Sequence, residues 1–133
     1  MRFIGKALGA SAAALVLTAI LPATANAATV QPSCSATGAN GSLRVENFHS
    51  GVKKINVSMT VYDSLADGKS AKIRLITQPG NGGEGVKYWP YHTNSGGKGT
   101  FKTWKTSATE NQGFTKIGVM VTRAGGTYCS DWA

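Results

Sequence analysis

The residues best suited to ligand chemistry are aromatic and basic, and they gather between positions 87 and 105. They are Trp89, Tyr91, Trp104, Lys87, Lys102 and Lys105. The C–H face of a sugar ring is apolar and stacks on aromatic rings, while lysines at the rim attract anions. These residues predict an exposed platform for a sugar ring, a base or a peptide. The alternative is that the same aromatic rings fill the core of a small domain.

Strand alternation predicts which of these side chains share a face. In an extended chain, Trp89 and Tyr91 point to the same side. If residues 87–106 form a hairpin, Lys102 and Trp104 join that side. The platform would then lie on one hairpin.

The chain is basic, with 14 Lys and Arg against 6 Asp and Glu and a formal net charge of +8. The basic residues are spread over several segments, which is typical of a solvated surface. If several of them align on one face, they would attract anionic polymers outside the cell, such as cell-wall polymers or extracellular nucleic acid. The sequence contains no specific nucleic-acid-binding motif.

Catalytic motifs are missing from the sequence. His49 and His92 are its only histidines, and there is no G-x-S-x-G, H-E-x-x-H or P-loop pattern. We therefore predict a non-enzymatic protein without cofactor or metal. A small hydrolase centred on His92 is the alternative. Asp63 and Asp67 could offer oxygens to calcium, but the following Gly68 favours a turn.

The first 27 residues are typical of a signal peptide. Arg2 and Lys6 precede an apolar stretch over residues 7–21, and Ala25-Asn26-Ala27 matches a cleavage site. We expect cleavage to leave a single secreted, extracellular domain over residues 28–133. No later apolar run is long enough to span a bilayer, so we expect no membrane attachment after cleavage, and a monomer.

Cys34 and Cys129 are the only cysteines, so only one intramolecular disulfide is possible. Such a bond suits an extracellular protein and would tie both ends of the domain together. The alternatives are a zinc site completed by the two histidines and a cysteine nucleophile.

The remaining pattern predicts strands. Residues 53–63 alternate strictly between apolar and polar, residues 71–76 and 114–123 do so too, and residues 43–48 form a shorter candidate. The Asp67-Gly68 pair predicts a hairpin between the first two of these strands. Pro90 cannot donate to a ladder, which predicts an edge or bulged strand. We expect about six to seven antiparallel strands in a small all-β sandwich, with an open β-barrel as the alternative.

Two short resemblances add to this reading. The leader, the run Asp63-Ser64-Leu65-Ala66-Asp67-Gly68 and the closing Cys129-Ser130-Asp131-Trp132 are similar to small secreted actinobacterial proteins, which implies export and a β-rich fold. Tyr88-Trp89-Pro90-Tyr91 resembles the aromatic triplet of tendamistat-type α-amylase inhibitors.

Two functions follow as expectations. The first is non-catalytic binding of an extracellular polysaccharide or anionic cell-wall polymer through the aromatic and basic residues. The second is inhibition of a secreted protease or amylase through a rigid loop, at residues 79–85 or 88–92.

Overall fold

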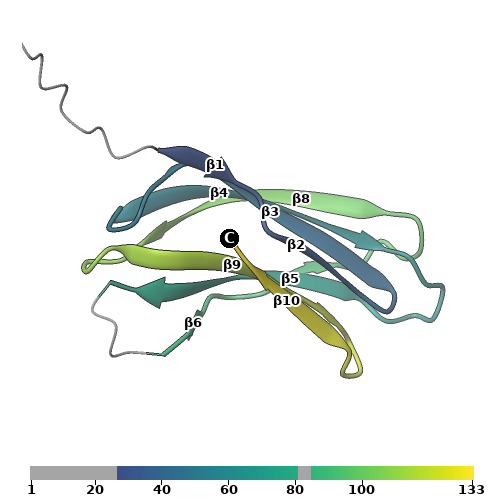
Figure 1. Ribbon diagram of the computed structural model, residues 1–133. Coiled ribbons are helices and arrows are strands. Elements are labelled where there is room, and N and C mark those ends of the chain that lie inside the picture. The colour runs from purple at the N-terminus through teal and green to yellow at the C-terminus, as the bar shows by residue number, and fades with distance from the viewer. Residues whose placement is uncertain (1–26, 81–84) are drawn as a thin grey trace, which may run out of the picture.

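The computed structural model describes residues 27–80 and 85–133 (Figure 1). Within these ranges the chain forms ten strands and no helix. The strands are β1 (Ala28–Val30), β2 (Ser33–Ala36), β3 (Ala39–Phe48), β4 (Lys54–Asp63), β5 (Ala71–Pro79), β6 (Lys87–Tyr88), β7 (His92–Asn94), β8 (Phe101–Thr109), β9 (Phe114–Arg123) and β10 (Tyr128–Trp132). The predicted signal peptide, apart from Ala27, lies outside the described residues. None of the described segments is a helix long and apolar enough to cross a membrane.

The strands form two antiparallel sheets that pack face to face (Figure 1). The first sheet has the order β1-β3-β4-β8, with β2 also paired to β3. The second has the order β10-β9-β5-β6, with β7 also paired to β5. The predicted all-β sandwich is confirmed, and the sheets do not close into a barrel. The strand number exceeds the expectation because β1 and β2 are too short to give an alternating pattern, and because the first strand of the hairpin predicted over residues 87–106 is divided into β6 and β7.

The core lies between the two sheets and follows the predicted alternation. In β4, the side chains of Ile55, Val57, Met59 and Val61 are buried, whereas the residues between them face outward. The inward residues of β5 and β9 complete the same cluster, together with the fully buried ring of Phe114. Two half-buried sheets thus cover each other's apolar faces, as a period of two requires.

The predicted hairpin between residues 53–63 and 71–76 is wrong. β4 pairs with β3 and β8 in the first sheet, whereas β5 pairs with β9, β6 and β7 in the second. The connection over residues 64–70 therefore crosses from one sheet to the other. Alternation shows that each strand is half-buried, but it does not show which strand is the partner.

A buried arginine holds this crossing. Arg123, at the end of β9, is 5% exposed, and its Nη1 lies 3.9 Å from Oδ1 of the buried Asp63. Its Nε donates to Asp67 Oδ2 at 2.8 Å, and its Nη2 donates to the Leu65 carbonyl at 3.3 Å. A Cβ on Gly38 would collide with the guanidinium group, so a glycine is required beside it. One side chain thus joins the second sheet to the turn that leaves the first.

The hydrogen bond from Arg123 lowers the pKa of the Asp67 carboxyl below its usual 3.8. A lowered pKa stabilises the fold fully above the unfolded value, and this contribution is lost as pH falls through the folded value. We expect the wild-type protein to be more stable than Asp67→Asn near neutral pH and the difference to shrink on acidification. Urea unfolding of both proteins between about pH 2 and pH 6 measures this. A difference that stays constant over that range would contradict the ion pair.

Candidate functional site

Trp89 faces the core rather than a ligand. Its ring packs against the core cluster and lies 6.5 Å from the ring of Phe114, centroid to centroid. Its indole N–H donates to the hydroxyl of the buried Thr77 at 3.0 Å. Because the buried hydroxyl of Thr77 requires a hydrogen-bond partner, this bond gives Trp89 a structural role.

Trp104 also points inward. It lies on β8, at the edge of the first sheet, and packs against the core. Its ring centroid lies 5.2 Å from that of His92 on β7 of the second sheet. The two rings therefore cover the gap between the sheets on this side of the sandwich. His92 thus has a packing partner on the opposite sheet.

The three predicted lysines lie in three different places. Lys87 is exposed at the edge of the second sheet, with its Nζ 4.4 Å from the Trp89 ring centroid and 3.6 Å from Glu110 Oε2. Lys102 shares the inward face of β8 with Trp104, and its Nζ lies 5.7 Å from that ring. Lys105 pairs in register with Ser58 on the outer face of the first sheet. Two of the three predicted lysines thus lie against the predicted tryptophan rings, whereas Lys105 lies on the opposite face of its sheet.

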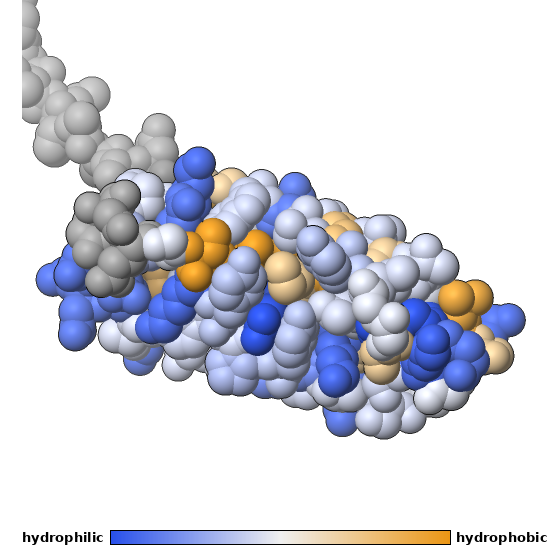
Figure 2. All heavy atoms as spheres, turned by 90° about the horizontal axis from the view of Figure 1, so that it is seen from below, coloured by the Kyte–Doolittle hydropathy of each residue, from blue (hydrophilic) through white to orange (hydrophobic). Residues whose placement is uncertain are grey.

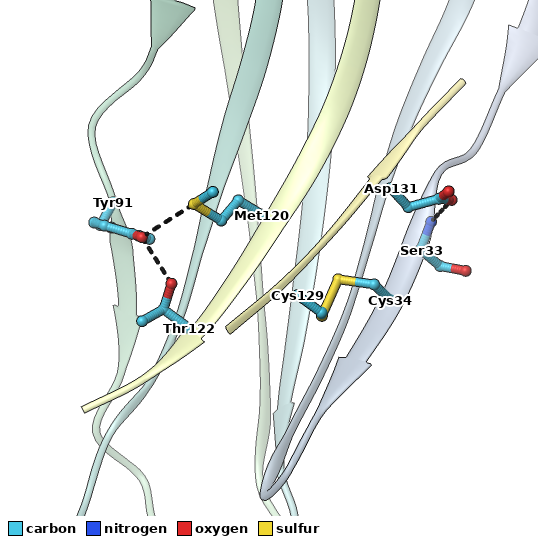
Figure 3. The surroundings of a disulfide bond; sticks show 7 residues. All are labelled: Ser33, Cys34, Tyr91, Met120, Thr122, Cys129 and Asp131. Atoms are coloured by element: carbon cyan, nitrogen blue, oxygen red, sulfur yellow. Dashed lines mark hydrogen bonds between the residues drawn. A yellow bond between two sulfur atoms is a disulfide. The ribbon is translucent and has the colours of Figure 1, made fainter. Parts of the chain in front are cut away.

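Tyr91 lies on the outer face of the second sheet. Its hydroxyl shares a 2.7 Å hydrogen bond with Thr122 Oγ1 and lies 3.4 Å from Met120 Sδ, both on β9 (Figure 3). The prediction that Tyr91 shares a face with Trp89 and Trp104 is therefore wrong. Residues 89–91 are not part of a strand, so the period of two does not continue through Pro90. The prediction that Pro90 marks a sheet edge is confirmed, since it separates the edge strands β6 and β7.

Arg74 holds Tyr91 and its neighbours in place. Its Cζ lies 3.8 Å from the ring centroid of Tyr91 and 5.3 Å from that of Tyr88. Its Nε donates to the Trp89 carbonyl at 2.9 Å. The guanidinium group thus lies against two tyrosine rings while it fixes the backbone between them.

Two further aromatic residues occupy this outer face, and both come from β10. Tyr128 pairs with Thr122, and Trp132 pairs with Gly118. A Cβ on Gly118 would lie 2.9 Å from Trp132 Cε3 and 3.0 Å from Ile76 Cγ1, so the indole ring lies over Gly118 and beside Ile76. Ile76 is only 2% exposed although it lies outside the core cluster. A layer of side chains therefore covers this face.

We call this surface the aromatic face. It consists of Tyr88, Tyr91, Tyr128 and Trp132, with Arg74 and Met120 between them. In the sheet register, Trp132, Gly118, Ile76 and Tyr88 form one row across four strands. The backbones of Trp132 and Tyr88 are therefore three interstrand spacings, or about 14 Å, apart. Tyr88 is 54% exposed, Tyr128 67% and Trp132 36%. The aromatic face is thus long enough for more than one sugar ring.

Figure 2 shows the molecule from the side of the second sheet. Hydrophobic residues appear there in small separate groups among hydrophilic and intermediate ones. Large protein interfaces are marked by continuous apolar patches. The surface in this view shows no such continuous patch.

The sequence contained a signal for the two aromatic residues of β10, Tyr128 and Trp132, which were not predicted as site residues. In an extended segment over residues 128–132, Cys129 and Asp131 share one side, and Tyr128, Ser130 and Trp132 share the other. Cys129 must point between the sheets to reach Cys34. Tyr128 and Trp132 must therefore point outward.

The predicted disulfide is confirmed. Cys34 on β2 and Cys129 on β10 are bonded, with their Cα atoms 6.0 Å apart, so the bond joins an edge of the first sheet to an edge of the second (Figure 3). The Ser33 N–H donates to Asp131 Oδ2 at 3.0 Å beside it. Because both thiols are used, the zinc and cysteine-nucleophile alternatives are wrong. No group of three or more His, Cys, Asp or Glu placed to hold a metal occurs in residues 27–80 and 85–133.

The outer face of the first sheet carries a depression lined mainly by polar and charged residues. This shallow depression of about 870 Å³ is lined by Arg44, Asn56, Ser58 and Lys105, among others. Arg44 is paired with Glu46 at 2.9 Å. No aromatic ring lines the depression, so it offers no stacking surface.

No protein-family model, curated protein or solved structure matches this chain.

Proposed function

We propose that this protein is a non-catalytic, extracellular polysaccharide-binding domain and that the aromatic face is its binding surface. The observation that carries the proposal is the exposure of Tyr88, Tyr128 and Trp132 on one outer face. Folded domains normally bury large aromatic rings, and an exposed group of them on a flat sheet suits ring stacking. The disulfide is compatible with an oxidising, extracellular location.

The aromatic face is also pre-organised. Tyr91 is fixed by its hydrogen bond to Thr122, and the indole of Trp132 lies on Gly118. Rings that are already held lose little conformational entropy when a ligand stacks on them. A weak contact per sugar ring can therefore add up along a polymer.

Retention on insoluble polysaccharides tests the proposal. We expect the wild-type protein to bind at least one of a panel of insoluble polysaccharides and cell walls, and Trp132→Ala to weaken that binding about tenfold, the equivalent of about 1.4 kcal/mol. Tyr88→Ala should have a similar effect because it removes the other end of the row. Depletion of protein from the supernatant at increasing polymer concentration measures the affinity.

Phe101→Ala is the matched control. Phe101 is 71% exposed and aromatic, but it lies on β8 of the first sheet. Its removal should leave binding unchanged. Equal retention of all three variants and the wild-type protein would contradict a role for the aromatic face.

One observation favours a second candidate, a secreted inhibitor of a protease or amylase. Rigid exposed loops suit inhibitors. Two hydrogen bonds hold residues 88–91: Arg74 Nε donates to the Trp89 carbonyl, and the Trp89 N–H donates to the Leu75 carbonyl at 3.1 Å. The other loop considered, residues 79–85, lies mostly outside the described residues. Inhibition of an amylase or protease by the wild-type protein would favour this candidate.

A further inference from the structure

Arg74 presents unused donors in the middle of the aromatic face. Of its guanidinium N–H groups, the one on Nε is occupied by the Trp89 carbonyl. In the part of the chain that the structure describes, its terminal nitrogens form no ion pair with a carboxylate. The group nevertheless lies over the ring of Tyr91, at 3.8 Å from Cζ to the ring centroid. It is a fixed cation beside the rings that would stack on a sugar.

The surrounding charge is also positive. Lys72 pairs with Thr122, and Lys116 pairs with Gln78, so both lie on the same outer face as Arg74. No side-chain carboxylate of the described residues projects from that face.

Every side-chain carboxylate of the described residues has a partner away from this face. Glu46 pairs with Arg44, Glu110 pairs with Lys87, and Asp63 and Asp67 both pair with Arg123. Asp131 points inward and accepts the Ser33 N–H. The positive charge of the aromatic face is therefore not neutralised by these groups.

We infer that the ligand of the aromatic face is an acidic polysaccharide and that Arg74 binds its anionic groups, an inference that rests on the proposed function. A guanidinium group binds a carboxylate or a phosphate through two parallel N–H···O bonds. A uronic acid carries its carboxylate at the edge of the sugar ring, where it can reach Arg74 while the ring stacks on Tyr88 or Tyr91. A sugar phosphate offers the same chemistry.

Two polymers with the same backbone and different charge provide the test. Polygalacturonate carries one carboxylate on each sugar, and its fully methyl-esterified form carries none. We expect the wild-type protein to bind polygalacturonate about tenfold more tightly than the ester in affinity electrophoresis or calorimetry. High salt should reduce the binding of the acid and leave that of the ester unchanged.

Variants of Arg74 distinguish binding of the anionic group from support of residues 88–91. Arg74→Gln should lower binding of polygalacturonate about tenfold and leave binding of the ester unchanged. Lys105→Gln removes one positive charge from the first sheet and should change neither. Arg74→Lys keeps the charge without the paired donors and should give an intermediate loss. Trp132→Ala should weaken binding of both polymers. Thermal unfolding of each variant checks the fold.

Results other than these would each contradict one part of the inference. Equal affinity of the wild-type protein for both polymers overturns the acidic preference and leaves the proposed function intact, and this comparison needs no variant. Equal losses on both polymers in Arg74→Gln make Arg74 a supporting residue only. Equal losses of polygalacturonate affinity in Arg74→Gln and Lys105→Gln would show that only the net charge of the protein matters. A poly(glycerol phosphate) arm distinguishes phosphate from carboxylate. Binding to none of the three polymers overturns the inference, whereas the proposed function is decided separately by retention on the panel of insoluble polysaccharides and cell walls.

Discussion

Reduction of the Cys34–Cys129 disulfide should lower the free energy of unfolding by about 4 to 5 kcal/mol. The two cysteines are 95 residues apart in sequence, and a cross-link over so long a loop removes much of the entropy of the unfolded chain. Small domains have total stabilities of about 5 to 15 kcal/mol. We therefore expect the melting temperature to fall by at least about 15 °C.

Thermal unfolding with and without reductant measures this effect, and the double variant Cys34→Ser/Cys129→Ser controls for side effects of the reductant. Hydrogen exchange should show the loss first in β2 and β10, because each pairs with only one neighbouring strand. Equal melting temperatures of the oxidised and reduced proteins would contradict a stabilising role for the bond.

Replacement of Arg123 should have an effect of similar size. In Arg123→Met, the side chain keeps much of its volume, but the buried carboxylate of Asp63 loses its cation. Removal of one partner from a buried ion pair costs about 3 to 5 kcal/mol. Urea unfolding near neutral pH measures the loss.

Two further variants test the cause. Asp63→Asn combined with Arg123→Met should recover part of the stability, because no unpaired charge is then buried. Arg44→Met removes an ion pair whose side chains are 49% and 65% exposed, and it should change the free energy of unfolding by about 1 kcal/mol or less. Equal effects of Arg123→Met and Arg44→Met would show that burial of the first pair does not matter.

The sequence predicted those parts of the fold that depend on one strand at a time. Alternation located β4, β9 and the inner residues of β5, and the count of cysteines left one possible disulfide. It did not predict that β4 and β5 belong to different sheets. Asp67-Gly68 is a common hairpin turn, but here Asp67 is held by Arg123, which lies 56 residues further along the chain. A contact of that separation leaves no local pattern.

Of the six site residues predicted from the sequence, Tyr91 alone lies on the aromatic face, and the reason lies in Pro90. Alternation holds only while the backbone stays in a strand. β6 ends at Tyr88 and β7 begins at His92, so the chain between them turns Trp89 into the core and lays Tyr91 over the outer face. Alternation around Cys129 could have placed Tyr128 and Trp132 on the outside, but the row that joins Trp132 to Tyr88 became evident only from the sheet register.

The position of Lys102 has a consequence for the free edge of β8. This strand pairs with β4 over nine residues without a bulge, and no strand of the described chain covers its other side. Such an edge is a template for self-association, in which a second copy would extend the sheet. Lys102 faces inward beside Trp104, so edge-to-edge pairing would trap its ammonium group in an apolar, unpaired setting. We therefore expect this one lysine to disfavour self-association at the longest open edge of the sandwich.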